Sequence, residues 1–207
     1  MKKLLLIMFI MFLISACGEK PSTATSIPTS TEAPIASPTV ALQIEPKVTP
    51  VCISPDPTQV DIDRALAYPG DLFDAPDWER SYTVSDGRVS VAWLNSPLSA
   101  VAVVEALVFP CSYEEPDLNY FFSAENWEVV FSNYDSFEST AACKTDVGIR
   151  LYQFIATTEG IEYDIKYWAE NDTDTRVMGA MLVFPSASPA LMDEYSSYLF
   201  PTFTSCS

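Results

Sequence analysis

The pattern of apolar and polar residues divides the chain into three parts. An unbroken apolar run covers Leu4–Leu13, whereas from Gly18 to about Thr58 the apolar residues follow no period. Beyond this point they recur with the spacings of strands and helices. We therefore expect a signal peptide at 1–16, a tether over 17–58 and one globular domain over 59–207.

Three strands are predicted in the second half of this domain, over Ile149–Thr157, Ile161–Ala169 and Arg176–Phe184. The polar segments between them are short enough for hairpin connections. Earlier, two extended segments flank Ser85-Asp86-Gly87, a typical hairpin turn. We expect one face of the middle strand to contact water, because its apolar residues alternate with Glu162, Asp164, Lys166 and Trp168.

A buried helix is predicted over residues 96–109. Ser96 can cap it, Pro97 suits its first position, and only Glu105 within it is charged. Because the remaining residues are nearly all apolar, this helix would be buried on almost every side.

Two further helices are expected. A short one lies within Asp117–Trp127, followed by an extended segment over 128–134. The last, about Pro189–Leu199, places Leu191, Tyr195 and Leu199 on one stripe.

The order of these elements predicts an α+β domain, an antiparallel sheet of about five to six strands with helices packed on it. This order is similar to that of the Mog1/PsbP-like α/β/α sandwiches, and the resemblance implies helices on both faces of the sheet.

The first residues have the order of a secretory signal: Lys2 and Lys3, the apolar run, then the small residues Ser15 and Ala16. A membrane-spanning anchor is the alternative. However, a helix over about 13 residues from Leu4 to Ala16 would span roughly 20 Å, against about 30 Å of hydrocarbon. The run is too short, so we expect export.

The residues Ile14-Ser15-Ala16-Cys17 resemble the lipobox of bacterial lipoproteins. The resemblance implies that Cys17 becomes the new N-terminus and carries a diacylglyceryl thioether, usually with an N-linked acyl chain such as palmitate. Two or three chains are enough for stable anchoring. Ordinary secretory cleavage, with Cys17 incidental, is the alternative.

The segment after Cys17 is rich in proline, serine, threonine and alanine and has no aromatic residue before position 59. Such a composition cannot bury enough apolar surface to fold, so we expect a disordered spacer between the membrane and the domain.

The net charge is −17. An acidic surface repels nucleic acid, which excludes it as a partner, and favours solubility. It is compatible with Ca²⁺, and Glu170, Asp172 and Asp174 alternate as in a calcium loop. However, Thr175 and Met181 replace the glycine and glutamate that such a loop needs. A polar hairpin turn is the favoured interpretation, and no cofactor is expected.

Four cysteines remain, Cys52, Cys111, Cys143 and Cys206, an even set in an exported chain that predicts two disulfides. Of the three possible pairings we prefer Cys111–Cys143 with Cys52–Cys206, which would tie the end of the tether to the C-terminus. A zinc site is the alternative, but the chain has no histidine and no C-x-x-C pair.

The lack of histidine also removes Ser-His and Cys-His nucleophiles and the usual base near neutral pH. No catalytic motif is present, although carboxylate pairs suited to a glycosidase remain available. For ligand binding, Trp168 is the one aromatic expected on a polar face. Asp71, Asp74 and Asp77 are further candidates, although an acidic edge on an aromatic core is the favoured interpretation of this segment.

These features favour a lipid-anchored extracytoplasmic protein whose tethered domain binds an envelope protein or a glycan. A carboxylate-dependent cell-surface hydrolase acting on glycans and a structural envelope protein are the alternatives.

Overall fold

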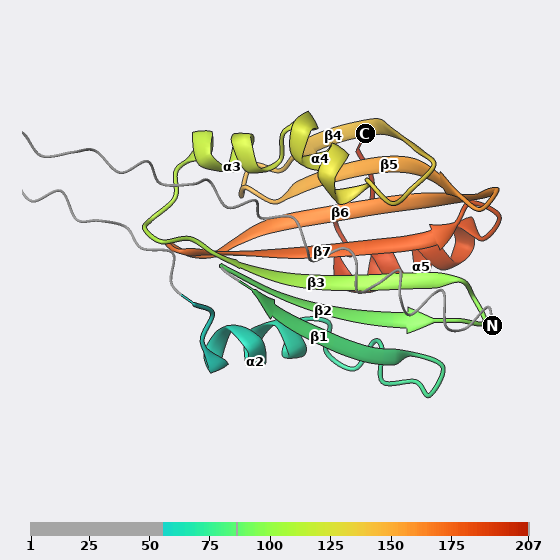
Figure 1. Ribbon diagram of the computed structural model, residues 1–207, viewed down its shortest axis with the longest axis horizontal. Coiled ribbons are helices and arrows are strands. Elements are labelled where there is room, and N and C mark those ends of the chain that lie inside the picture. Colours follow the sequence, from blue (N-terminus) through green and yellow to red (C-terminus); the bar gives the residue numbers. More distant parts are fainter. Residues whose placement is uncertain (1–55, 86, 207) are drawn as a thin grey trace, which may run out of the picture.

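The computed structural model describes residues 56–85 and 87–206. One sheet contains seven strands: β1 (Glu79–Ser85), β2 (Arg88–Asn95), β3 (Ala100–Val108), β4 (Ser136–Lys144), β5 (Arg150–Thr158), β6 (Ile161–Thr173) and β7 (Arg176–Pro185). Their order is β1-β2-β3-β7-β6-β5-β4, and all neighbours are antiparallel (Figure 1). The last strand in sequence, β7, therefore joins two three-stranded meanders at the centre of the sheet.

Helices cover both faces of this sheet. α2 (Gln59–Ala67) and α5 (Pro189–Leu199) lie on one face, and α3 (Glu115–Phe121) and α4 (Ala124–Val130) lie on the other (Figure 1). Each face has its own hydrophobic core. The predicted α+β class, with helices packed on an antiparallel sheet, is confirmed, but the sheet has seven strands rather than five or six.

The segment 96–109 contains β3, so the prediction of a buried helix there is wrong. After a turn in which Asn95 Oδ1 accepts a hydrogen bond from the Leu98 N–H at 3.1 Å, the chain pairs with β2 and β7. The two cores take residues from opposite sides of β3, such as Val104 on one and Leu107 on the other. A strand covered on both faces is apolar throughout, and its spacing does not distinguish it from a buried helix.

The elements between β3 and β5 also differ from those expected. The predicted short helix is present as α3, but residues 128–134, expected to be extended, complete α4 and the turn after it. Trp127 and Phe131 lie four residues apart on the buried side of α4. The next segment forms β4, which the sequence does not predict because this edge strand is mostly exposed and has little apolar alternation.

The three strands predicted in the second half of the domain are confirmed as β5, β6 and β7, and the first hairpin by the pairing of Ser85 with Arg88. The expectation that one face of β6 contacts water is wrong for part of that strand. Lys166 and Trp168 are 8% and 0% exposed. They are covered by α5, itself a confirmed prediction, and by the segment that follows it.

The C-terminal segment crosses the sheet from α5 towards β4. The ring of Phe200 stacks on that of Trp168 with centroids 4.8 Å apart, and Trp168 Nε1–H donates a hydrogen bond to the Phe203 carbonyl at 2.8 Å. The Cys206 N–H donates to Gln153 Oε1 at 2.8 Å. These contacts carry Cys206 to the edge of the sheet opposite β1.

There Cys206 forms a disulfide with Cys143, with Cα atoms 5.7 Å apart. The preferred pairs Cys111–Cys143 and Cys52–Cys206 are therefore wrong, because the sequence does not reveal the course of the C-terminal segment. Cys111 is also disulfide-bonded. Since Cys143 and Cys206 bond to each other, the partner of Cys111 lies outside the described residues, as do Cys17 and Cys52.

Within the described ranges, no helix is long and apolar enough to cross a membrane. The predicted signal peptide over 1–16 and nearly all of the predicted tether over 17–58 lie outside these ranges.

Candidate functional site

Three acidic residues proposed for ligand binding are exposed in the segment between α2 and β1: Asp71, Asp74 and Asp77. Their neighbours Phe73 and Trp78 are buried in the core beneath α2 and α5. In the part of the chain that the structure describes, no group of three His, Cys, Asp or Glu residues is arranged to hold a metal ion. The three acids therefore lie at an exposed edge of an aromatic core.

Trp168 has no exposed surface. Its ring stacks on Phe200 and its indole N–H is bonded to the Phe203 carbonyl, so it presents no face to a ligand. The prediction that Trp168 lies on a polar face is wrong, because the C-terminal segment covers it.

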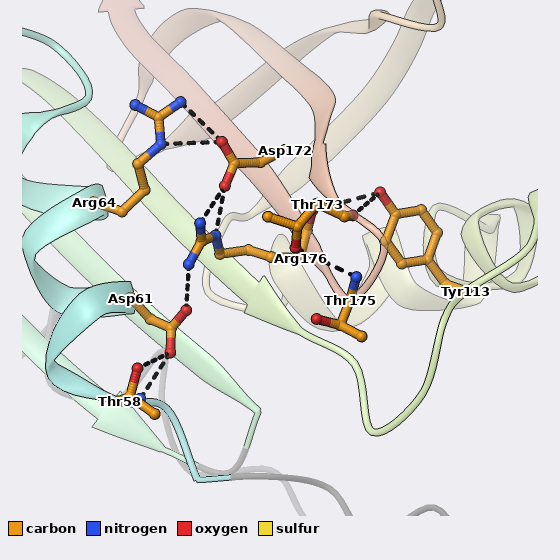
Figure 2. Close-up of polar contacts among 8 residues, drawn as sticks. All are labelled: Thr58, Asp61, Arg64, Tyr113, Asp172, Thr173, Thr175 and Arg176. Carbon is orange, nitrogen blue, oxygen red and sulfur yellow. Dashed lines mark hydrogen bonds and ion pairs between the residues drawn. The ribbon is translucent and has the colours of Figure 1, made fainter.

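One acid of the β6–β7 hairpin, Asp172, binds two arginine side chains. Figure 2 shows Arg176 between two carboxylates, with Nη1 2.6 Å from Asp61 Oδ1 and Nη2 2.5 Å from Asp172 Oδ2. Arg64 of α2 contacts Asp172 at 2.9 Å. The four residues, which we call the hairpin network, fasten α2 to the end of β6 and the start of β7.

Asp61 is held as a carboxylate within this network. Burial raises its pKa, but hydrogen bonds from the Thr58 N–H and hydroxyl and from Arg176 outweigh this effect and keep the pKa below its usual value. Beside the network, Glu170 accepts a hydrogen bond from the Tyr68 hydroxyl at 2.9 Å. Two of the three acids of the candidate calcium loop are thus occupied by protein groups.

A second polar cluster lies on the face of the sheet that α3 and α4 cover, where the hydroxyl of Tyr167 donates to Glu105 Oε2 at 3.1 Å and Ser90 donates to Glu105 Oε1 at 3.0 Å. Burial, followed by the charge of Glu105, raises the pKa of Tyr167 well above its usual value. A Cβ atom at Gly179 would lie 2.2 Å from the Tyr167 hydroxyl oxygen, so the close approach requires glycine. This cluster has a packing role.

A hollow of about 260 Å³ lies between α5 and strands β4, β5 and β6. We call it the Lys166 hollow. Its polar lining consists of Thr140, Gln153, Asp164, Lys166 and Asp193, and its other lining residues are Phe154, Ile155, Ile165, Pro189 and Met192. A concave site with an apolar wall and a few convergent polar groups is typical of small-molecule binding, and this volume lies just below the range of about 300–1,000 Å³ for such sites.

Lys166 is the distinctive residue of this hollow. Its side chain is only 10% exposed, and its ammonium nitrogen lies 3.6 Å from Asp193 Oδ1, farther than a hydrogen bond. The side chain of Asp193 is 76% exposed, so water weakens the pair. An ammonium group has three donors, and a single long ion pair leaves it able to bind an anionic group.

The other polar residues are placed by their elements. Asp164 precedes Lys166 by two positions on β6, and its Oδ1 accepts a hydrogen bond from Ser186 Oγ at 2.9 Å. Thr140 lies where the register of β4 against β5 shifts, an irregularity that redirects side chains and is frequent near functional sites. Pro189 begins α5, so the positive end of that helix adjoins the hollow.

In the sequence, Lys166 belongs to a face of β6 expected to contact water, and no pattern distinguishes Gln153 or Thr140. The one indication in the sequence is that Lys166 shares a strand face with Trp168. Whether this face is exposed or buried depends on α5, which follows later in the chain and covers it.

No family model matches this chain, and no curated protein matches it.

Proposed function

We propose that the chain is a lipid-anchored extracytoplasmic binding protein whose domain takes up a small anionic ligand in the Lys166 hollow. The observation that carries the proposal is a lysine side chain that is only 10% exposed at the wall of a hollow, and whose one ion pair within the described residues is 3.6 Å long. Burying a cation is costly unless it is compensated, so an anion placed there would gain a strong, charge-assisted contact.

The remaining lining narrows the ligand class. Asp164 and Asp193 add two carboxylates, which accept hydrogen bonds from hydroxyl or amino groups. Gln153 uses its Oε1 for the Cys206 N–H, which leaves its amide group as a donor. The ligand that fits is the size of a monosaccharide or an amino acid, with one acidic group and further hydroxyl or amino groups.

The Lys166 hollow lies far from the end of the domain at which the proposed tether would join it. Lys166 and Thr173 are seven residues apart on β6, a separation of about 23 Å. The hairpin network lies at this end of β6, where α2 joins the sheet (Figure 2). The proposed tether would therefore hold the domain by one end of β6, with the hollow towards the other.

The membrane attachment is proposed on the signal-like first residues and on Cys17. It is supported by the disulfides at Cys111 and Cys143–Cys206, because such bonds form and persist in exported proteins. Mass spectrometry of the native N-terminus should find acylated Cys17, and Cys17→Ser should release the protein from membranes. An intact Met1 terminus would contradict the proposal.

We also propose the finer fold assignment, an arrangement like the Mog1/PsbP-like α/β/α sandwiches. The helical layers on both faces of the sheet support it. Superposition of an experimental structure on members of that group would test it, and a different strand order would contradict it.

Ligand binding is tested by calorimetric titration of the protein with monosaccharide acids and amino acids, each beside a neutral analogue. Binding of an acid should weaken about 10- to 100-fold in Lys166→Met, because a charge-assisted hydrogen bond is lost. Lys144→Met is the matched control, since this lysine lies on β4 and pairs with Glu115, outside the hollow lining. Failure of every acid to bind, or equal binding by Lys166→Met, would contradict the proposal.

A second candidate function is carboxylate-dependent hydrolysis of a glycan, because Asp164 and Asp193 line the same hollow. Turnover of an aryl-glycoside set that Asp164→Asn abolishes would establish it. Ligand binding without turnover would leave the binding proposal alone, and a protein with neither property would fit the structural alternative.

A further inference from the structure

A second hollow, of about 390 Å³, lies beside the disulfide-bonded Cys111. We call it the aromatic hollow. The loop after β3 and helix α3 provide its lining: Phe109, Pro110, Cys111, Ser112, Tyr113, Asp117, Tyr120 and Phe121. Tyr120 is 79% exposed. A large exposed ring at the wall of an apolar hollow marks a surface that another segment can cover.

The walls of the aromatic hollow are held in place. The ring of Phe109 lies 4.9 Å from that of Tyr113 and 6.2 Å from that of Phe121. The Tyr113 hydroxyl donates to the Thr173 carbonyl at 3.0 Å (Figure 2), and the Phe109 N–H donates to the Thr175 carbonyl at 2.8 Å. A segment that docks here would therefore bind without the entropic cost of ordering these side chains.

The disulfide at Cys111 brings another part of the chain to this hollow. The Cα atoms of a disulfide lie about 4.4–6.8 Å apart, so the residues next to the partner cysteine must lie near the lining. Cys52 precedes Asp56, the first described residue, by four positions, and such a segment spans at most about 14 Å. Cys17, the other cysteine outside the described residues, would have to bring a distant segment.

The contacts of the hairpin network place the start of α2 close to the Cys111 loop. Asp61 in the first turn of α2 binds the Arg176 side chain, and the Arg176 carbonyl lies 3.4 Å from the hydroxyl of Tyr113. One residue thus joins α2 to the lining of the aromatic hollow. The short reach from Asp56 back to Cys52 is consistent with this arrangement.

The residues before Cys52 suit the aromatic hollow. The segment Pro46–Val51, PKVTPV, has two prolines, two valines and one charged residue, Lys47. Proline-containing segments dock on aromatic surfaces at low entropic cost because their extended form exists before binding. Asp117 lines the hollow and offers a charge of opposite sign to Lys47.

We propose that Cys52 pairs with Cys111 and that the segment Pro46–Val51 docks in the aromatic hollow. The tether then leaves the domain beside α3 in a defined direction, which fixes how the domain is oriented relative to its anchor. The inference does not depend on what the Lys166 hollow binds.

Trypsin cleavage of the oxidised full chain tests the docking. Lys20 precedes proline and resists trypsin, so Lys47–Val48 is the cleavable bond of the segment 17–58. We expect this bond to be cut about tenfold more slowly in the wild type than in Tyr120→Ala, an energy difference of about 1.4 kcal/mol. Pro50→Gly, a change in the segment itself, should accelerate cleavage similarly.

Tyr82→Ala is the matched control, because Tyr82 is 55% exposed on β1, at the far edge of the sheet. It should leave the cleavage rate unchanged. Equal rates in the wild type and Tyr120→Ala would overturn the proposal, as would protection that increases with protein concentration, which would indicate a second copy as the occupant. Peptide mapping should recover a Cys52–Cys111 pair, and a Cys17–Cys111 pair would also overturn it.

Discussion

Two cations with little exposure lie in different surroundings in this domain. Arg176 is 14% exposed and lies between Asp61 and Asp172, whose side chains are 9% and 12% exposed, at 2.6 and 2.5 Å. Lys166 is 10% exposed, but its partner Asp193 is 76% exposed and 3.6 Å away. The two cations are buried to a similar extent, but the carboxylates of the protein neutralise the charge of Arg176 much more closely than that of Lys166.

The difference separates a cation with two close carboxylates from a cation with one distant, exposed carboxylate. Burying a charge costs free energy that only close partners and hydrogen bonds recover. Arg176 has such partners on both sides, so the hairpin network is complete without any further molecule. Lys166 is only partly compensated, and an anion in its hollow would supply what is missing.

The largest expected effect follows from breaking the complete network. Arg176→Met should lower the free energy of unfolding by about 2–4 kcal/mol, because it leaves the carboxylates of Asp61 and Asp172 with little exposure and without their shared partner. Urea denaturation measures this loss. Arg80→Met, on the exposed strand β1, is the control and should change stability by less than about 0.5 kcal/mol. A loss below about 1 kcal/mol for Arg176→Met would contradict the assignment.

The hairpin network should also respond to pH. The pKa of Asp61 is lowered in the folded protein, so the unfolded chain binds the proton first as the pH falls. The stabilisation that ionised Asp61 gives the folded protein is complete above about pH 4 and is lost as the pH falls through the pKa of Asp61 in the folded protein. Urea denaturation between about pH 2 and 5 should show a shallower decline for Asp61→Asn than for the wild type. Parallel curves would show that Asp61 does not contribute.

The spacing of apolar residues and the turn residues between them correctly predicted β5, β6, β7 and α5. β5 and β7 are largely apolar, β6 alternates apolar with polar residues, and short polar turns separate the three strands, while α5 begins with a proline and has one apolar stripe. β3 was not predicted, because burial on both faces removes the alternation that distinguishes a strand from a helix. β4 was not predicted for the opposite reason, since exposure on an edge removes most of its apolar residues.

The hairpin network and the surroundings of Lys166 could not be predicted, because each depends on contacts between distant positions. Arg176 and Asp61 are 115 residues apart in sequence, and Trp168 is bonded to a carbonyl 35 residues later. Lys166 was expected to be exposed, but it is buried because α5 and the C-terminal segment cover its face of the sheet. The pairing of Cys143 with Cys206 has the same origin.

Replacing the partly compensated cation should have a small effect on stability. Lys166→Met keeps the aliphatic part of the side chain and leaves Asp193 solvated, so the free energy of unfolding should stay within about 1 kcal/mol of the wild type, with any change an increase. The measurement is urea denaturation in parallel with Arg176→Met. A loss as large as that of Arg176→Met would show that Lys166 is also structural and would remove the contrast.

The smallest expected effect concerns the exposed partner. Asp193→Asn should change stability by less than about 0.5 kcal/mol, because the ion pair of Asp193 with Lys166 is long and screened by water. It should nevertheless strengthen the binding of an acidic ligand several-fold, since it removes a negative charge beside the ammonium group. Calorimetric titration measures this change, with Glu194→Gln, on an exposed position of the same helix, as the control. Weaker binding of the acid by Asp193→Asn would mean that Asp193 contacts the ligand directly and that its hydrogen bonds outweigh its repulsion of the acidic group.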